Sequence, residues 1–271
     1  MRVGTARHDG DLVPVAVEGE EMRALGAPSL LELIQSGGKP EATGEAINGA
    51  RLTAPLIPPK IVAIGLNYLD HVRESGGDPP ERPLVFTKFT SSVIGDGDEI
   101  QLDRSITERA DWEVELAVVV GKRMRRVPKE EALDYVFGYT VANDVSARDV
   151  QFADGQWVRG KSLDTFCPLG PVIVTADEIP DPQSLALRTR VNGELVQDSS
   201  TAEMIFSVAE ILSFCSHSFP LDPGDVVLTG TPWGCGEFME PRRSLQDGDV
   251  VEVEIEGIGT LTNACVELPA A

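Results

Sequence analysis

Three acidic residues at alternating positions are the first candidates for chemistry in this sequence. Asp111, Glu113 and Glu115 lie in the run 111–120, whose other residues are apolar and which is typical of a β-strand. Successive strand side chains point to opposite faces, so the three carboxylates share one face and repel each other. A divalent cation would relieve the repulsion, and carboxylate oxygens suit Mg²⁺, with Mn²⁺ or Ca²⁺ as alternatives, better than zinc.

A second segment offers one more carboxylate. The apolar run 137–142 ends in Asn143-Asp144. The polar end of a neighbouring strand is where a further metal ligand would lie, so Asp144 is a candidate to join the carboxylates of the run 111–115. Spacing alone is a weak signal, and an exposed acidic strand face is the alternative explanation of residues 111–115.

His71 and Glu74 are the candidates for acid–base chemistry. Side chains three residues apart on a helical turn are neighbours, so Glu74 could orient the imidazole of His71 and raise its basicity. A surface histidine is the alternative. Residues 73–82, which contain a Gly-Gly and a Pro-Pro pair, are predicted to form a mobile lid that closes over bound substrate.

The composition limits the class of protein. With 271 residues, 42% hydrophobic and 25% charged, the chain can bury a substantial core. A membrane span needs about 18 consecutive apolar residues, and neither such a run nor a signal peptide is evident, so we expect a cytoplasmic protein without membrane contact. The net charge of −21 argues against nucleic-acid binding. Four cysteines without zinc spacing are predicted to be reduced and buried.

The apolar patterns predict a mainly β protein of the α+β class. Residues 1–58 form a small N-terminal α+β domain that ends in a proline cluster, and 59–271 form the catalytic domain. Short strand candidates recur through the second part. Covering helices are expected over 29–35, 129–135 and 201–213, the first with Ser29 as its cap.

An ordered set of motifs runs through residues 65–264. The motifs are Gly65-Leu66-Asn67-Tyr68, Asp70-His71, Glu113-Val114-Glu115, Asn143-Asp144-Val145-Ser146-Ala147-Arg148-Asp149, Gln151-Phe152-Ala153-Asp154-Gly155-Gln156-Trp157, Gly160-Lys161-Ser162, Pro223-Gly224-Asp225-Val226, Leu228-Thr229-Gly230-Thr231-Pro232 and Gly257-Ile258-Gly259. With these motifs the chain resembles the fumarylacetoacetate hydrolase family, most closely its smaller bacterial acylpyruvate hydrolases, hydroxyhepta-dienedioate isomerases and oxaloacetate decarboxylases. The resemblance implies a mixed β-sandwich or roll, a homodimer, and metal ligands at Glu113, Glu115 and Asp144, which leaves Asp111 outside the ligand set.

The resemblance also assigns roles to individual residues. Lys161 and Gln151 match active-site positions, where Lys161 would neutralise the carboxylates or a forming enolate and Gln151 would orient water or substrate. Gly230 and Thr231 would offer a backbone amide and a hydroxyl to a substrate carboxylate. Tyr68 would border the pocket, with core packing as the alternative.

The sequence departs from the family at two places that flank the pocket, which leaves the substrate open. Leu66 stands where arginine is common, and Phe86–Phe89 reads Phe-Thr-Lys-Phe instead of Phe-Leu-Lys-Pro. Arg148 and Asp149 are expected to form a structural ion pair.

The function expected from the sequence is Mg²⁺-dependent hydrolysis of a C–C bond in a small β-diketo acid, an acylpyruvate or fumarylpyruvate, through a metal-stabilised enolate. The partner is thus a small 2-oxo acid. An oxaloacetate decarboxylase or a 2-hydroxyhepta-2,4-diene-1,7-dioate isomerase using the same site is the alternative. A non-catalytic metal-binding protein is the alternative of another class.

Overall fold

The larger sheet of the protein runs through most of the molecule. The computed structural model describes residues 1–269, and its main sheet has the strand order β4-β3-β2-β1-β14-β12-β11-β17-β6-β7, with β5 paired to β1 and β8 to β14. The strands are β1 (Arg2–His8), β2 (Asp11–Glu18), β3 (Glu21–Leu25), β4 (Ala42–Ala46), β5 (Arg51–Thr53), β6 (Ile61–Gly65), β7 (Leu84–Lys88), β8 (Val93–Ile94), β11 (Val114–Val120), β12 (Val136–Asn143), β14 (Cys167–Thr175) and β17 (Val226–Leu228).

A second sheet, of five strands in the order β16-β15-β18-β19-β9, packs against the first. Alternate residues of β15 are buried, as the period of a strand requires when one face meets the core. A two-stranded sheet, β10-β13, is not hydrogen-bonded into either of these sheets. The strands are β9 (Ile100–Leu102), β10 (Ala110–Asp111), β13 (Ser146–Ala147), β15 (Ala186–Val191), β16 (Glu194–Ser200), β18 (Val250–Ile255) and β19 (Gly259–Glu267).

β11 is an interior strand of the larger sheet, and its composition explains why. All seven of its residues are buried and four of them are valine, which suits a strand covered on both faces. It pairs with β12 on one side and β17 on the other, both antiparallel. The architecture predicted from the sequence, an α+β fold made mainly of β-strands, is therefore confirmed.

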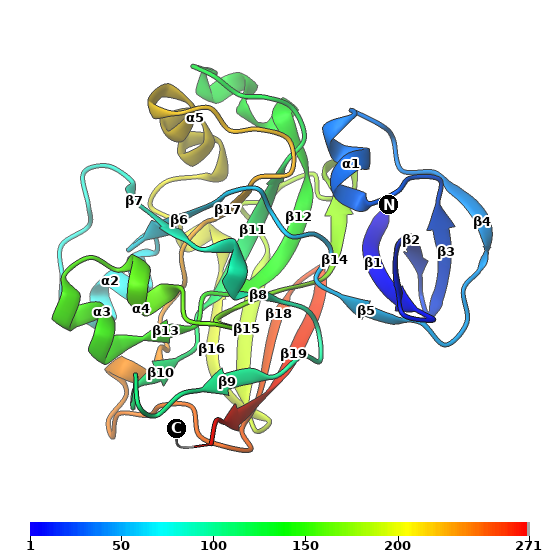
Figure 1. The fold of residues 1–271 in the computed structure, drawn as a ribbon. Coiled ribbons are helices and arrows are strands. Elements are labelled where there is room, and N and C mark those ends of the chain that lie inside the picture. The colour runs from blue at the N-terminus through cyan, green and yellow to red at the C-terminus, as the bar shows by residue number, and fades with distance from the viewer. Residues whose placement is uncertain (270–271) are drawn as a thin grey trace.

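Few helices accompany the sheets, and none of those described is long and apolar enough to span a membrane. Figure 1 shows α2, α3 and α4 together on the side of the molecule away from the N-terminal strands. The α-helices are α1 (Leu30–Gln35), α2 (Leu69–Ser75), α3 (Arg148–Asp154), α4 (Val158–Lys161) and α5 (Val208–Ser218), and the 3-10 turns are η1 (Thr90–Ser92), η2 (Lys129–Tyr135), η3 (Ala176–Glu178), η4 (Thr201–Glu203) and η5 (Gly236–Phe238).

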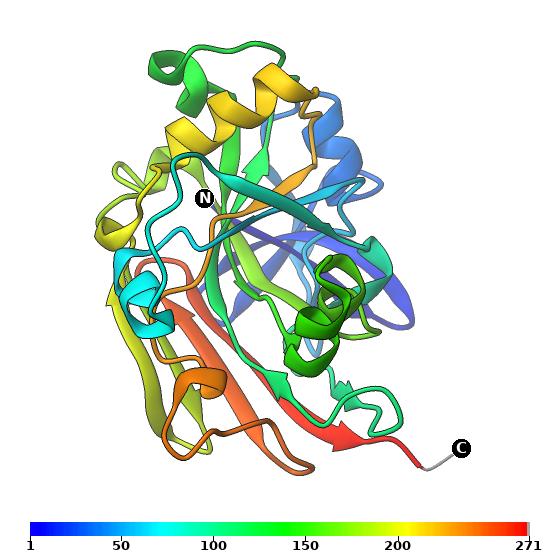
Figure 2. The same ribbon diagram turned by 90° about the vertical axis from the view of Figure 1, so that its left-hand side faces the viewer.

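The helix predictions are confirmed in one case and need correction in two. Ser29 caps α1 as expected. The helix predicted over 201–213 is wrong at its start: α5 begins only at Val208, because Ser207 and Glu210 form a reciprocal capping box there. Residues 129–135 form a 3-10 helix that packs beside α5 at one end of the molecule (Figure 2).

The N-terminal strands continue the larger sheet. β1 pairs antiparallel with β14, Val3 opposite Ile173, and Figure 1 shows these strands in blue beside β14. Leu30 and Ile34 of α1 belong to the same buried cluster as Ile61 of β6. Hydrogen bonds and a shared core thus join the first 58 residues to the rest, and the division into 1–58 and 59–271 stays a sequence prediction.

The cysteine prediction holds for each of the four residues. Cys167, Cys215, Cys235 and Cys265 are all free thiols and all buried. Three of them pack in hydrophobic clusters of the two sheets, namely Cys167, Cys215 and Cys265. Cys235 lies instead directly before η5, close to His71 and Glu74 of α2.

Candidate active site

Three carboxylates meet where β11 begins and β12 ends. Because these strands are antiparallel with Val114 opposite Asn143, the residue before β11 and the residue after β12 become neighbours. The amide of Asp144 donates to the carbonyl of Glu113 over 2.9 Å. The carboxylate oxygens of Glu113, Glu115 and Asp144 lie within 4.8 Å of one another, and all three side chains are buried. The structure therefore brings the predicted metal ligands together.

Asp111 lies outside this cluster because the strand predicted over 111–120 is interrupted. β10 ends at Asp111 and β11 begins at Val114. The Asp111 carboxylate accepts hydrogen bonds from the amides of Gly236, over 2.8 Å, and Glu237, over 3.1 Å, and from the Arg148 side chain, over 2.8 Å. It holds Arg148 and the first residues of η5 instead of joining the cluster.

Three buried cations surround two of the carboxylates. Nζ of Lys161 lies 2.7 Å from Glu113 Oε2 and 2.7 Å from Asp144 Oδ2. Lys88 Nζ lies 2.6 Å from Asp144 Oδ1, and Arg148 Nη1 lies 2.7 Å from Glu113 Oε1. Burial raises the pKa of the Glu113 carboxyl, but Lys161 and then Arg148 outweigh burial and bring it to about 2. Glu113 is thus an anion at neutral pH.

Glu115 differs from its neighbours because no cationic side chain among the described residues pairs with it. Its Oε2 accepts the Gly230 amide over 2.7 Å. Burial, and then the charges of Asp144 and Glu113, raise the pKa of Glu115 well above its ordinary value. A further cation beside Glu115 would offset this repulsion.

The charge balance and the donor atoms fit a divalent cation. With all four ionised, four carboxylates against three cationic side chains leave one negative charge in this buried region, and burial of uncompensated charge is costly. The donor atoms are carboxylate oxygens, which hard cations such as Mg²⁺ prefer. The carboxylates are Asp111, Glu113, Glu115 and Asp144, and the cations are Lys88, Arg148 and Lys161.

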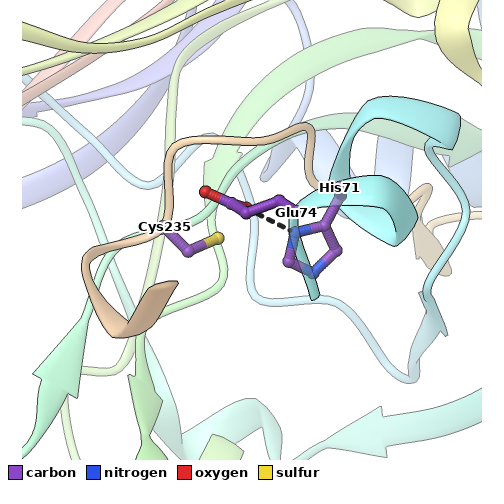
Figure 3. Close-up of side chains that lie close together, drawn as sticks. All are labelled: His71, Glu74 and Cys235. Atoms are coloured by element: carbon purple, nitrogen blue, oxygen red, sulfur yellow. Dashed lines mark hydrogen bonds and ion pairs between the residues drawn. The ribbon is translucent and has the colours of Figure 1, made fainter. Parts of the chain in front are cut away.

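The predicted histidine–glutamate pair is formed on α2. His71 Nδ1 lies 3.1 Å from Glu74 Oε2, and Figure 3 shows the contact as a dashed line. The other Glu74 oxygen accepts the Gly234 amide over 2.8 Å, and Phe238 packs edge-on against the imidazole. The pair therefore exists without any movement of residues 73–82, and closure of that segment stays a prediction.

A cavity of about 300 Å³ lies between His71 of the pair and two of the carboxylates, Glu113 and Glu115, whereas Glu74 and Asp144 are not among its lining residues. Six of the predicted site residues line it: His71, Glu113, Glu115, Gln151, Lys161 and Thr231. Arg148 adds a cation, and the remaining wall is mostly apolar. That wall consists of Ile64, Gly65, Leu66, Ser75, Phe86, Phe152, Trp157 and Phe238.

Most of the chain matches the model of one known protein family. The family described as fumarylacetoacetate (FAA) hydrolase C-terminal matches residues 60–266. The chain belongs to the fumarylacetoacetate hydrolase family. The resemblance drawn from the motifs is thereby confirmed, and the match begins close to the predicted boundary at residue 58.

Individual members of the family are similar over most of the chain. A mitochondrial oxaloacetate tautomerase of Xenopus laevis is 48% identical over 218 residues, which cover 79% of this chain and 68% of that protein. A fumarylacetoacetate hydrolase from Exiguobacterium antarcticum has a TM-score of 0.92 at 40% identity, with 99% and 100% of the two chains covered. A 2-hydroxyhepta-2,4-diene-1,7-dioate isomerase from Mycobacterium marinum has a TM-score of 0.86 at 37% identity, with 100% of each covered. Similarity to a tautomerase and an isomerase favours the isomerase alternative over the hydrolase expected first.

In this family member two of the predicted residues are held by other side chains at the cavity wall. Gln151 Oε1 accepts from Arg148 Nη1 over 3.1 Å, and Thr231 Oγ1 accepts from Gln197 Nε2 over 3.0 Å. Both keep polar atoms beside the cavity. Their predicted roles toward substrate or water stay proposals.

Tyr68 and Gly230 lie behind the cavity wall. The Gly230 amide, expected to face a substrate carboxylate, donates to Glu115 instead. Tyr68 is fully buried and belongs to the main hydrophobic cluster, as the core-packing alternative stated. Burial, followed by the charges of Glu115 and Asp70, raises the pKa of the Tyr68 hydroxyl. Of the two, Gly230 supports the carboxylates directly, through its hydrogen bond to Glu115.

Lys88 and Arg148 are site residues that the sequence reasoning did not identify. Asp149 accepts hydrogen bonds from the Thr107 hydroxyl and the Glu108 amide, so the predicted Arg148–Asp149 ion pair is wrong. Adjacent residues at the start of a helix point in different directions, and Arg148 turns to the carboxylates. The sequence does contain a signal for Lys88: it is a charged residue at the end of the otherwise mostly apolar strand β7.

Proposed function

We propose that this enzyme interconverts the keto and enol forms of oxaloacetate, or of a close 2-oxo acid, with a divalent cation held by Glu113, Glu115 and Asp144. The observation that carries the proposal is that Glu113 and Glu115 of the carboxylate cluster and His71 of the His71–Glu74 pair line one small cavity. A keto–enol reaction needs charge stabilisation at an oxygen and proton exchange at the adjacent carbon, and these two groups supply both. The similarity to an oxaloacetate tautomerase supports the choice of substrate.

The cation has one chemical task in this proposal. Bound to the three carboxylates, Mg²⁺, or Mn²⁺ or Ca²⁺ in its place, would act as a Lewis acid that draws negative charge toward the 2-oxo oxygen of the substrate. Its ligands would be held in place by the side chains around them. Asn143 accepts the Glu113 amide over 3.0 Å and Gly230 donates to Glu115, so the ligand positions are fixed before any cation binds.

The protein's own side chains move the proton. Glu74 accepts from Nδ1 of His71, which leaves Nε2 free to take a proton from C3 of the substrate. The C–H electron pair becomes the C2–C3 double bond and the carbonyl pair moves to the 2-oxo oxygen. Protonated His71 then returns its proton to that oxygen, directly or through solvent, which gives the enol and restores the neutral imidazole. Lys161 and Arg148 place positive charge beside the cavity, and their burial strengthens it. No bond between carbons breaks.

Three other reactions use the same groups and remain competitors. The His71–Glu74 pair could activate water, which would produce the acylpyruvate hydrolysis expected from the sequence. The similarity to a 2-hydroxyhepta-2,4-diene-1,7-dioate isomerase favours a second proton-transfer reaction on a longer dicarboxylic acid. Oxaloacetate decarboxylation is the third outcome to be measured.

A substrate panel distinguishes these reactions. The Mg²⁺-loaded enzyme is mixed with the enol of oxaloacetate, with acetylpyruvate and with fumarylpyruvate, and products are followed by NMR and by enol ultraviolet absorbance. The proposal expects conversion of the oxaloacetate enol to its keto form without pyruvate release above the uncatalysed rate. Dominant cleavage of an acylpyruvate would replace it with the hydrolase, and rapid pyruvate release from oxaloacetate would replace it with the decarboxylase.

The remaining expectations concern assembly and location. We propose a homodimer and a cytoplasmic location, both from the family resemblance and the composition. Light scattering after size exclusion measures the first directly, since one chain has a mass of 29.1 kDa. A mass near one chain would refute the dimer. Limited proteolysis near residue 58 tests the proposed division of the chain into two domains.

A further inference from the structure

A second group of potential metal ligands lies at the same cavity, and its donor atoms differ from those of the carboxylate cluster. An imidazole nitrogen of His71, a carboxylate oxygen of Glu74 and Sγ of Cys235 all lie within 4.8 Å of one another. Figure 3 shows the Cys235 side chain directed from its loop toward the Glu74 carboxylate and the His71 ring. The keto–enol reaction proposed above uses the first two residues and gives Cys235 no role.

The backbone fixes Cys235 against α2. The Gly234 amide donates to Glu74 Oε1 over 2.8 Å, so the residue before the cysteine is bound to the acid of the pair. Gly234 has φ of +96°, and a Cβ at this position would lie 2.1 Å from the carbonyl oxygen of Val196. Only glycine allows this approach of the loop. The distance between the thiol and the pair is therefore set by the fold.

The Cys235 thiol has only weak partners. Sγ lies 3.9 Å from the Pro232 carbonyl oxygen and 4.0 Å from Gln197 Nε2, both long contacts for sulfur. It is fully buried, whereas His71 lines the cavity and gives the group contact with entering solutes. A cation that enters the cavity would therefore meet the imidazole first, and the sulfur lies within 4.8 Å of the imidazole nitrogen.

We propose that His71, Glu74 and Cys235 form a binding site for a thiophilic divalent cation of the Zn²⁺ type, separate from the carboxylate cluster. Sulfur, nitrogen and oxygen donors form three-residue tetrahedral zinc sites with an open fourth position, and donors in such a site lie about 3.5 Å apart. Because the three atoms lie within 4.8 Å of one another, they need to approach by at most about 1.3 Å to reach that spacing. Mg²⁺ prefers the oxygen-only cluster, so the two sites select different ions.

Occupancy of this site would inhibit the enzyme. A cation bound to His71 and Glu74 replaces the hydrogen bond between them and removes the imidazole from proton transfer. This consequence rests on the proposed function, whereas binding of the cation does not. Binding also displaces the thiol proton to solvent, so affinity is expected to increase with pH.

Binding is tested on the full chain in saturating Mg²⁺ by titration with Cd²⁺, whose thiolate complexes absorb in the near ultraviolet. The proposal expects one equivalent of Cd²⁺ to produce a thiolate charge-transfer band in the wild-type protein. The band is expected to be absent in Cys235→Ala and in the nearly isosteric Cys235→Ser. Cys265→Ala, which removes another fully buried thiol, is the matched control and is expected to retain it. No band in the wild type, or an unchanged band in both Cys235 variants, overturns the site.

Inhibition is tested separately with Zn²⁺ in the same buffer. The wild-type and Cys265→Ala proteins are expected to lose tautomerase activity, and Cys235→Ser to need at least ~10-fold more Zn²⁺ for the same loss, in line with removal of one metal ligand. Equal inhibition of all three proteins would show that Zn²⁺ acts elsewhere and overturn the inhibitory role. Cd²⁺ absorbance without any tautomerase activity would leave the site intact and refute the proposed function instead.

Discussion

Glu115 and Gly230 are joined by a 2.7 Å hydrogen bond from the backbone amide to Oε2, and this bond orients the one member of the carboxylate cluster that lacks a cationic partner among residues 1–269. The other two members are neutralised by Lys161, Lys88 and Arg148. Glu115 is therefore the member of the cluster whose charge a divalent cation would offset, and the first predictions concern this residue and its donor.

Replacing Glu115 by Gln is expected to abolish metal-dependent activity. The amide keeps the size of the side chain and can still accept from Gly230, but it lacks the charge. Mg²⁺ affinity is expected to fall by more than the ~10–100-fold loss that removal of an outer partner causes. Calorimetric titration with Mg²⁺ measures this, with exposed Glu131→Gln as the control. Full activity in Glu115→Gln would remove this residue from the metal site.

Gly230→Ala is expected to weaken metal binding and stability together. Gly230 has φ of +96°, and an added Cβ would lie 2.8 Å from the Cβ of Asn67, so the amide must shift away from Glu115. Gly257→Ala is the matched control, since φ is +75° there and the Cβ has ordinary contacts. Both variants are expected to lose ~1–3 kcal/mol of stability through backbone strain. Only Gly230→Ala should lower Mg²⁺ affinity, and equal affinities would contradict the supporting role.

His71→Ala is expected to slow tautomerisation by ~10²–10⁴-fold, the usual contribution of a positioned acid–base group. Mg²⁺ affinity should change little, because His71 is not among the carboxylate ligands. If acylpyruvate hydrolysis is detectable, it should fall as well, since it needs the same base. His217→Ala on α5 is the control, and steady-state kinetics compares the two. Equal rates for both variants would exclude His71 as the base.

Lys88→Met is expected to destabilise the protein by ~3–5 kcal/mol, because it leaves the buried Asp144 with one cation fewer. Lys88 is only 1% exposed. Lys129→Met removes a solvent-exposed lysine from its ion pair with Glu210 and should cost less than about 1 kcal/mol. Urea denaturation in EDTA compares the variants without a bound metal. Similar losses would show that the Lys88–Asp144 pair contributes no more than a surface pair.

Glu210 provides a pH test of the fold away from the site. Lys129 and the amide and hydroxyl of Ser207 lower its pKa from 4.5 to about 2. A lowered carboxyl pKa stabilises the folded state above the ordinary value, and this contribution disappears as pH falls toward about 2. Glu210→Gln should therefore be less stable than wild type at pH 7 and equally stable near pH 2. A constant difference across that range, in urea denaturation, would contradict the assignment.

The carboxylate cluster could be predicted because it depends on local sequence. Alternation placed Glu113 and Glu115 in one strand region, and the end of an apolar run marked Asp144. His71 and Glu74 followed from helical spacing in the same way. These residues are close in space because short segments and one antiparallel register bring them there, so pattern and motif order were sufficient.

Contacts between distant segments could not be predicted. Lys88 meets Asp144 across 56 positions of sequence, and Arg148 meets Asp111 across 37. Periodicity describes which face a side chain lies on but carries no information about its partner on another element. The late start of α5 has a similar reason: the apolar spacing in 201–213 suits a helix, but the Ser207 capping box decides where it begins.

Exchange of the C3 hydrogens of oxaloacetate with solvent deuterium is the most direct test of the central claim. The rate is followed by NMR in D₂O with Mg²⁺, with EDTA, and without enzyme. We predict that the Mg²⁺-loaded wild-type enzyme exchanges these hydrogens well above the rate in Mg²⁺ buffer alone, and that EDTA or Glu115→Gln returns the rate to that background. Exchange no faster than background with Mg²⁺, or equally fast in EDTA, would contradict a metal-dependent proton transfer at this site.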